Sequence, residues 1–283
     1  MRMKGWSLGL TIIGLVLVVF SVVWLLAIFP TMVKLPEDHH RVINFEGTYL
    51  VLNPDTQTLD EIPVCVEREQ LATDVQGNVL IITETVCCTH ALADMELPQF
   101  GAYGELSVDR STRAYVSDQT DGMPRSGQFC FPSDLEKESY SMWILSAGRP
   151  LEAEFVGEEE FHGLTVFAFE ISEQDLDIGT QEGTGIPQVV DVAISLKVEP
   201  VTGTTVYTAS DTTYSIVPAP DMKVPYYISN IVFNEETIAE LVDDAAGNRS
   251  MILWVSFYGF WIVIAVGAAL VVSGVVTAIR SKE

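Results

Sequence analysis

Apolar residues are concentrated at the two ends of the 283-residue chain. Residues 5–33 and 250–279 contain no charged side chain. Each run exceeds the roughly 20 apolar residues that a helix needs to cross a bilayer core of about 30 Å. We therefore predict transmembrane helices over 5–33 and 251–279, with short terminal segments, 1–4 and 280–283, outside the membrane.

The first run also begins like a secretory signal peptide, with two basic residues before the apolar stretch. The stretch is longer than the roughly 7 to 15 apolar residues of a signal peptide. Phe29 and Pro30 also stand where small cleavage-site residues are expected, so we predict an uncleaved anchor. Small residues have the spacing of close helix packing at Gly5 and Gly9 in the first run, and at Ala265, Ala269 and Ser273, or at Gly274 and Ala278, in the second.

The residues between the two runs, 34–250, show the pattern of a β-rich domain. Runs rich in β-branched and aromatic residues predict strands over 42–52, 78–87, 164–171 and 189–198. Gly163 predicts a hairpin turn between the run 155–161 and the strand that begins at Leu164, and Gly203 predicts a second turn that leads into a strand. Asn234 predicts the start of a helix over 234–246. The expected fold class is a mainly β extracytoplasmic domain, sandwich-like or barrel-like, flanked by N- and C-terminal transmembrane α-helices.

Charge is distributed as unevenly as hydropathy. Segment 34–250 holds 38 of the 39 acidic residues and 11 of the 15 basic ones, so its charge is −27, against −24 for the whole chain. Such a charge excludes nucleic acid as a partner and disfavours contact with an anionic lipid surface. The other basic residues lie at the chain ends. By the positive-inside rule we expect cytoplasmic termini and an extracytoplasmic middle domain in a cell membrane.

All four cysteines, Cys65, Cys87, Cys88 and Cys130, fall within the acidic segment. An even number is typical of disulfides in an oxidising compartment, and four cysteines permit three pairings. Cys87 and Cys88 are adjacent in a predicted strand, so their side chains point to opposite faces. We expect Cys65 and Cys130 as their disulfide partners, with free buried thiols as the alternative.

Four motifs, at 108–116, 128–143, 155–169 and 198–203, follow one another as in a known family. They resemble the PorA-like porin family of two-helix-anchored, extracytoplasmic β-rich proteins from actinobacteria and archaea. The residues that carry the resemblance are Asp109, Arg110, Phe131, Pro132, Lys137, Tyr140, Trp143, Gly157, Glu159, Gly163, Leu164, Glu199, Pro200 and Gly203. The chain departs from the family pattern at Arg113, where glycine is usual, and at Ile144, where aspartate is usual.

The resemblance implies a pore-forming protein. The family was once labelled a domain of unknown function. The layout is also similar to that of class B scavenger receptors, whose β ectodomain encloses a lipid tunnel. This second likeness implies a lipid ligand.

Catalytic patterns are missing from the sequence, which has no nucleophile elbow, phosphate-binding loop or zinc-protease motif. The segment 37–40 and the acidic runs 118–122 and 175–182 contain metal-ligand residue types without a complete metal-site spacing. We predict no catalytic residue, no metal and no cofactor. Asn248 begins an Asn-Arg-Ser sequon and is a candidate glycosylation site.

The expected function is that of a non-enzymatic, two-pass cell-envelope protein. Its acidic extracytoplasmic domain would bind a partner or an apolar ligand, or have a structural role. Two alternatives stay open, a pore-forming membrane protein and an extracytoplasmic enzyme. The expected partners are the lipid bilayer, a second copy or another envelope protein, and a lipid ligand.

Overall fold

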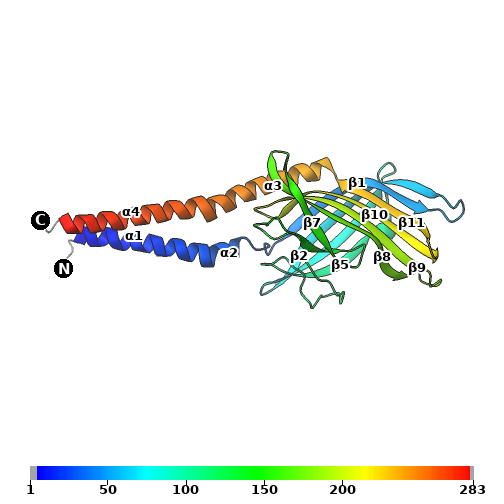
Figure 1. Ribbon diagram of the computed structural model, residues 1–283, viewed down its shortest axis with the longest axis horizontal. Helices are drawn as coiled ribbons and strands as arrows, with labels where there is room; N and C mark the ends of the chain where they lie inside the picture. The colour runs from blue at the N-terminus through cyan, green and yellow to red at the C-terminus, as the bar shows by residue number, and fades with distance from the viewer. Residues whose placement is uncertain (1–4, 281–283) are drawn as a thin grey trace. The chain divides into compact units, whose positions relative to one another are not determined.

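The computed structural model describes residues 5–280 and divides the chain into two compact units (Figure 1). One unit comprises Met1–Lys34 and Gly247–Glu283, and the other comprises Leu35–Ala246. The predicted terminal segment 1–4, and residues 281–283 of the other terminal segment, lie outside the described residues.

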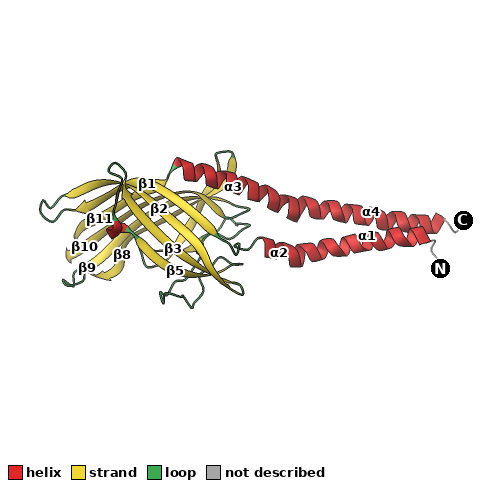
Figure 2. Ribbon diagram, turned by 180° about the vertical axis from the view of Figure 1, so that it is seen from behind, coloured by secondary structure: helices red, strands yellow, loops and turns green. Residues whose placement is uncertain are grey.

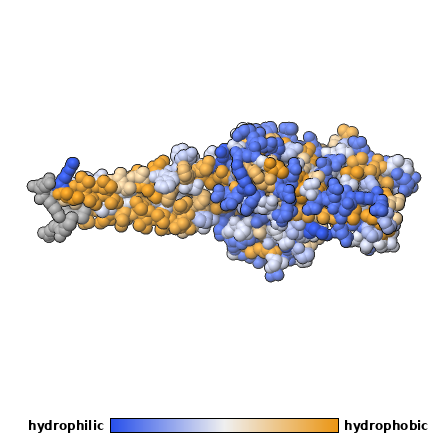
Figure 3. Space-filling model, in the orientation of Figure 1, coloured by the Kyte–Doolittle hydropathy of each residue, from blue (hydrophilic) through white to orange (hydrophobic). Residues whose placement is uncertain are grey.

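Two long helical runs contain the apolar ends of the chain. The first consists of α1 (Gly5–Val23), a π-helical turn η1 (Trp24–Ile28) and α2 (Phe29–Met32). The second consists of α3 (Glu235–Leu253), a π-helical turn η3 (Trp254–Tyr258) and α4 (Gly259–Arg280). Both runs are long and apolar enough to cross a membrane. Apolar residues dominate the visible surface of the helices, whereas hydrophilic residues cover much of the β unit (Figure 3).

Helices α1 and α4 lie side by side and pack through small residues (Figures 1 and 2). The buried small residues are Ser7, Gly14 and Ser21 on α1, and Gly267, Gly274 and Ala278 on α4. A Cβ atom added to Gly14 would lie 2.5 Å from the Gly267 carbonyl oxygen, so the two backbones are in close contact. Of the residues predicted for helix packing, Gly274 and Ala278 are in this interface. Gly9 faces open space, and the alternative set Ala265, Ala269 and Ser273 is exposed.

The β unit is built from one open antiparallel sheet of 11 strands (Figure 2). The strands are β1 (His40–Leu52), β2 (Leu59–Gln76), β3 (Val79–His90), β4 (Met95–Glu96), β5 (Ala102–Asp109), β6 (Tyr140–Ile144), β7 (Arg149–Phe161), β8 (Leu164–Thr180), β9 (Pro187–Glu199), β10 (Thr204–Ala219) and β11 (Met222–Phe233). Their order is β4-β3-β2-β1-β11-β10-β9-β8-β7-β6, and β5 also pairs with β3. The prediction of a mainly β fold between two apolar helices is confirmed.

The four predicted strands correspond to β1, β3, β8 and β9. The predicted hairpin turn joins β7 to β8, with φ of +47° at His162 and +82° at Gly163. Two consecutive positive φ angles are typical of the tight turns that match the twist of a β-hairpin. Asn234 caps α3 as predicted, because its Oδ1 accepts a 2.9 Å hydrogen bond from the Thr237 N–H.

The segment between β5 and β6 connects the two edges of the sheet. Isolated bridges join Val108 of β5 to Tyr115, Ala114 to Gln128, and Gln128 to Met142 of β6. A short 3-10 helix, η2 (Pro98–Phe100), precedes β5. The core of the β unit includes one cluster in which Ile238, Leu241, Val242 and Ala245 of α3 pack with residues of β1, β2 and β11.

Candidate functional site

Asp109 ends strand β5 and organises the turn that follows. Its Oδ1 accepts hydrogen bonds of 2.9 and 2.8 Å from the N–H groups of Ser111 and Thr112. Its Oδ2 accepts a 2.6 Å bond from Asn78 Nδ2. Burial opposes ionisation of the carboxyl, but these donors outweigh it and hold the pKa of Asp109 below its usual value. The charged carboxylate therefore stabilises one conformation of the turn.

Arg110 connects this turn to the segment that precedes β1. Its Nε donates a 2.8 Å hydrogen bond to the Leu35 carbonyl, and its Nη1 donates one of 2.7 Å to Glu37. The Arg110 carbonyl accepts a 2.9 Å bond from the Leu35 N–H. Arg110 thus fixes residues 35–37 against the end of β5.

Arg113 has a left-handed backbone conformation, with φ of +60°. This conformation favours glycine and costs other residues about 1–2 kcal/mol. The side chain offsets that cost, because Nη1 donates 2.8 Å hydrogen bonds to the carbonyl oxygens of both Phe131 and Thr202. The residue that departs from the family pattern therefore links three distant segments.

The turn between β9 and β10 packs against the Phe131–Pro132 segment. Glu199 is fully buried and accepts hydrogen bonds from the N–H groups of Val201 and Thr202, at 3.2 and 2.8 Å. Gly203 has φ of +72°, and a Cβ atom there would collide with the Pro132 carbonyl oxygen. The turns 109–113 and 199–203 and the segment 131–135 therefore meet at one place, which we call the motif junction.

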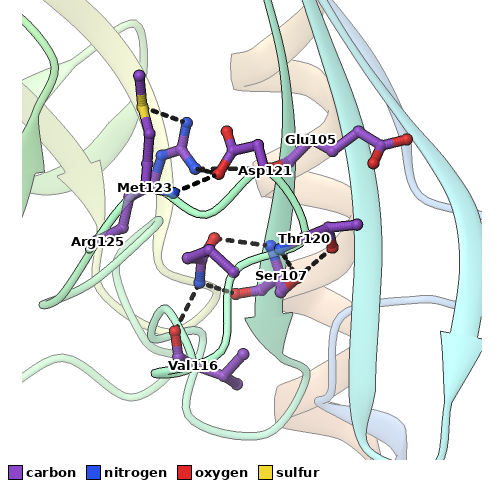
Figure 4. A network of polar contacts seen from close by, with 8 residues as sticks. Glu105, Ser107, Val116, Thr120, Asp121, Met123 and Arg125 are labelled. Carbon is purple, nitrogen blue, oxygen red and sulfur yellow. Dashed lines mark hydrogen bonds and ion pairs between the residues drawn. The ribbon is translucent and has the colours of Figure 1, made fainter.

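Next to the motif junction, the loop that follows β5 is attached to that strand by a polar network (Figure 4). The Gln119 side chain accepts a 3.0 Å hydrogen bond from the Ser107 N–H and donates one of 2.9 Å to the Ser107 carbonyl. The buried side chain of Arg125 pairs with Asp121 at 2.7 Å. This hydrogen-bonded pair lowers the pKa of Asp121. Asp121, from the acidic run 118–122, thus has a positively charged protein partner.

The other motif residues lie along β6–β8. Tyr140 packs edge-on against Phe131 and Phe169 in the core, whereas Trp143 contacts Tyr115. Because Tyr140 and Trp143 are three residues apart on one strand, they point to opposite faces of β6.

Charged motif residues on β7 and its neighbours form ion pairs. Lys137 pairs with Glu158 at 2.6 Å, and Glu159 pairs with Lys197 at 2.8 Å. A surface pocket of about 370 Å³ lies over these strands and is lined by Glu158, Glu159, Glu170 and Lys197, among others. Gly157 lies beside a bulge in β7, and Leu164 is buried at the start of β8.

Sequence reasoning missed a polar row on the core-facing side of the sheet. Strand register places Arg41 of β1 opposite Gln70 of β2, and Gln70 opposite Glu84 of β3. Arg68 is on the same face in the adjacent row, because it pairs with Ile43. The sequence contained a signal for this row. On each strand the core-facing positions alternate, and Arg41 and Arg68 take up such positions two residues from the buried apolar residues Ile43 and Val66.

This environment suppresses positive charge on His39, beside the row. Burial, reinforced by the charge of Arg41, lowers the pKa of His39 to about 4, although a hydrogen bond with Gln70 opposes the shift. Burial likewise lowers the pKa of Arg41; Cys130 and Asp244 oppose this shift, whereas Arg113 and Arg68 add to it. The His39 ring meets the Phe129 ring edge-on, at 6.4 Å between centroids.

The disulfide prediction was wrong, because all four cysteines are free. Cys65 lies opposite Thr89, and Cys87 lies opposite Glu67, so these two exposed cysteines are only diagonal neighbours. Diagonal neighbours in a sheet are about 7–8 Å apart, whereas a disulfide needs Cβ atoms about 4 Å apart. Cys88 faces the core on the other side of the sheet, and Cys130 is half-buried.

The segments with metal-ligand residue types are occupied by protein contacts. His40 hydrogen bonds to Glu69 at 2.9 Å. In the acidic run 175–182, Asp175 pairs at 2.7 Å with Lys223, which also binds Asp191 at 2.6 Å. Residues 5–280 contain no group of three or more His, Cys, Asp or Glu side chains placed to hold a metal ion. Asn248 is exposed within α3, and its glycosylation stays a prediction.

Comparison with protein families gives a match that covers nearly the whole chain. The family described as Porin PorA matches residues 6–276. The chain belongs to the PorA porin family. Together with the two apolar helices, this membership identifies a membrane protein of a porin family, and it favours a non-enzymatic role. A search of curated proteins gave no match.

Replacing Arg113 should separate its backbone strain from its hydrogen bonds. Arg113→Gly and Arg113→Ala both remove the bonds to Phe131 and Thr202, but only glycine relieves the positive φ. We expect both variants to be less stable than the wild type, and Arg113→Ala to be about 1 kcal/mol less stable than Arg113→Gly. Thermal unfolding of the purified proteins measures this order, and equal stability of the two variants would contradict it.

The low pKa of His39 predicts a loss of stability in mild acid. The folded state keeps the imidazole neutral down to about pH 4, whereas the unfolded chain binds a proton near pH 6.5. Stability is therefore full above pH 6.5 and falls by up to about 3 kcal/mol as the pH drops to about 4. Unfolding measured between pH 7.5 and 4.5 should show a smaller decline for His39→Gln. An unchanged pH dependence in that variant would show that another group is responsible.

Proposed function

We propose that the protein is a two-pass cell-envelope protein whose acidic β unit binds a partner outside the cytoplasm. The proposal is based on the uneven distribution of charge along the chain. Segments 5–33 and 250–279 contain no charged side chain, whereas segment 34–250 has a net charge of −27. The apolar helices anchor the chain in the bilayer, and both termini are cytoplasmic. The acidic surface favours a partner with a basic face, because complementary charge accelerates and orients association.

The polar side chains of the motif junction support binding or a structural role over catalysis. The carboxylates of Asp109 and Glu199 accept backbone N–H groups, and Arg113 donates to backbone carbonyls. These groups are engaged in holding turns, whereas a catalytic group must direct a hydrogen bond at its substrate. The enzymatic alternative therefore receives no support from this junction.

Packing within the β unit favours a protein partner over an apolar ligand. Phe131 and Phe169 are almost fully buried, with ring centroids 4.7 Å apart. Val190, Val192 and Val198 fill the same cluster. Side chains in contact occupy the space that an acyl chain would need in this part of the sheet.

A second candidate function is pore formation, which membership of the PorA porin family favours. The close contact between Gly14 and Gly267 leaves no lumen between α1 and α4 of one chain. A water-filled path would therefore need several copies, and the apolar helices offer no charged ring to line it.

The exposed thiols of Cys65 and Cys87 can report the proposed orientation. A membrane-impermeant maleimide added to intact cells should label the wild-type protein. The double variant Cys65→Ser/Cys87→Ser should lose most of the label, because Cys88 is buried and Cys130 is half-buried. Labelling that requires cell lysis would place the β unit in the cytoplasm and refute the proposal.

Planar-bilayer recording distinguishes the two candidate functions. Purified protein at increasing load should give no conductance above that of detergent alone, because one helix pair encloses no channel. Discrete conductance steps whose frequency rises with protein load would favour the pore-forming function.

A further inference from the structure

The core-facing side of β1 and β2 concentrates positive charge within a strongly acidic segment. Arg41 and Arg68 lie in adjacent rows on the same face of the sheet, as the register requires. Arg113 is held nearby through its bonds to Phe131 and Thr202. The Arg41 guanidinium interacts electrostatically with both of the other arginines. We call Arg41, Arg68 and Arg113 the arginine cluster.

Two members of the arginine cluster lack a negatively charged protein partner in direct contact. Within residues 5–280, neither Arg41 nor Arg68 forms an ion pair. The Nε of Arg68 is buried without a hydrogen-bond partner, and its guanidinium lies 5.5 Å from the centre of the Phe45 ring. The carboxylate of Glu84, in the row of Arg41, accepts a 2.6 Å bond from Gln70.

Removing a cation from water is costly unless a hydrogen-bonded anion compensates it. The buried side chain of Arg125 shows the usual solution, because it pairs with Asp121 at 2.7 Å. Arg41 and Arg68 are half-buried, so each side chain is partly desolvated and partly exposed.

We propose that Arg41 and Arg68, with Arg113 beside them, bind an oxyanion on the core-facing side of β1 and β2. The planar guanidinium donates two parallel hydrogen bonds that match a phosphate or carboxylate group. The ligand is a small molecule or a lipid headgroup that bears such a group. This inference goes beyond the proposed function, because the ligand is an anion and the partner proposed above has a basic face.

Thermal unfolding of the full chain, purified in an uncharged detergent with chloride as the only anion, tests the site. At constant ionic strength, inorganic phosphate should raise the unfolding midpoint of the wild type in a saturable manner. In Arg41→Gln and Arg68→Gln the phosphate concentration for half of the effect should rise at least tenfold. The matched control Arg149→Gln, on β7 and outside the arginine cluster, should respond like the wild type.

A second set of measurements separates the sources of the anion and guards against misfolded variants. A response to micelles with phosphatidylglycerol, but not to phosphatidylcholine micelles or inorganic phosphate, would assign the site to a lipid headgroup. Arg41→Lys keeps the positive charge but loses the planar pair of N–H donors, so it should bind phosphate with intermediate affinity. In chloride alone Arg41→Gln should unfold no earlier than the wild type, because no partner is lost.

The inference is overturned if no anion stabilises the wild type, or if Arg41→Gln and Arg68→Gln respond like Arg149→Gln. Either result would leave the proposed partner binding intact, because thiol labelling in cells tests the orientation separately. Failure of the labelling experiment, in turn, would not affect phosphate binding by the purified protein.

Discussion

The β unit depends on the hydrogen bonds that the Arg113 guanidinium donates to the carbonyl oxygens of Phe131 and Thr202. One side chain thereby joins the turn after β5, the segment before β6 and the turn after β9. Isolated bridges also connect the two edges of the sheet in this region, and the N–H groups of Asp134 and Leu135 donate hydrogen bonds to the carbonyls of Val201 and Pro200. A half-buried guanidinium can donate to two carbonyls at once, which a glycine at this position cannot do.

Uninterrupted or alternating apolar patterns allowed much of the fold to be predicted. The membrane helices contain no charge over nearly 30 residues, and β1, β3, β8 and β9 are rich in β-branched residues. Strand β2 was missed for physical reasons. Pro63 and several acidic residues in β2 are typical of loops, and a bulge near Thr73 interrupts the two-residue period. Long-range pairing stabilises this strand in spite of its local sequence.

The candidate site was only partly predictable, because strand register decides which side chains meet. The motif residues came from a resemblance, and the structure brings some of them, such as Asp109, Phe131 and Gly203, into one junction. The even number of cysteines favoured disulfides, but the register of β2 and β3 does not place Cys65 opposite Cys87. The arginine cluster escaped notice because its members are 27 and 45 residues apart along the chain. Only the sheet places them on one face.

The π-helical turns have a consequence for the angular orientation of the helical runs. Each turn closes a bond to the fifth preceding residue, as from the Phe29 N–H to the Trp24 carbonyl. Such a turn inserts about one extra residue, which rotates all following side chains by roughly 100° about the helix axis. The seven-residue spacing of Ser7, Gly14 and Ser21 stops just before Trp24, and Gly267 follows the turn at Trp254. After each π-helical turn, the side chains therefore point in a different direction around the helix axis. One continuous helical run thus has two contact faces, one before and one after the turn, and each face has its own sequence requirements.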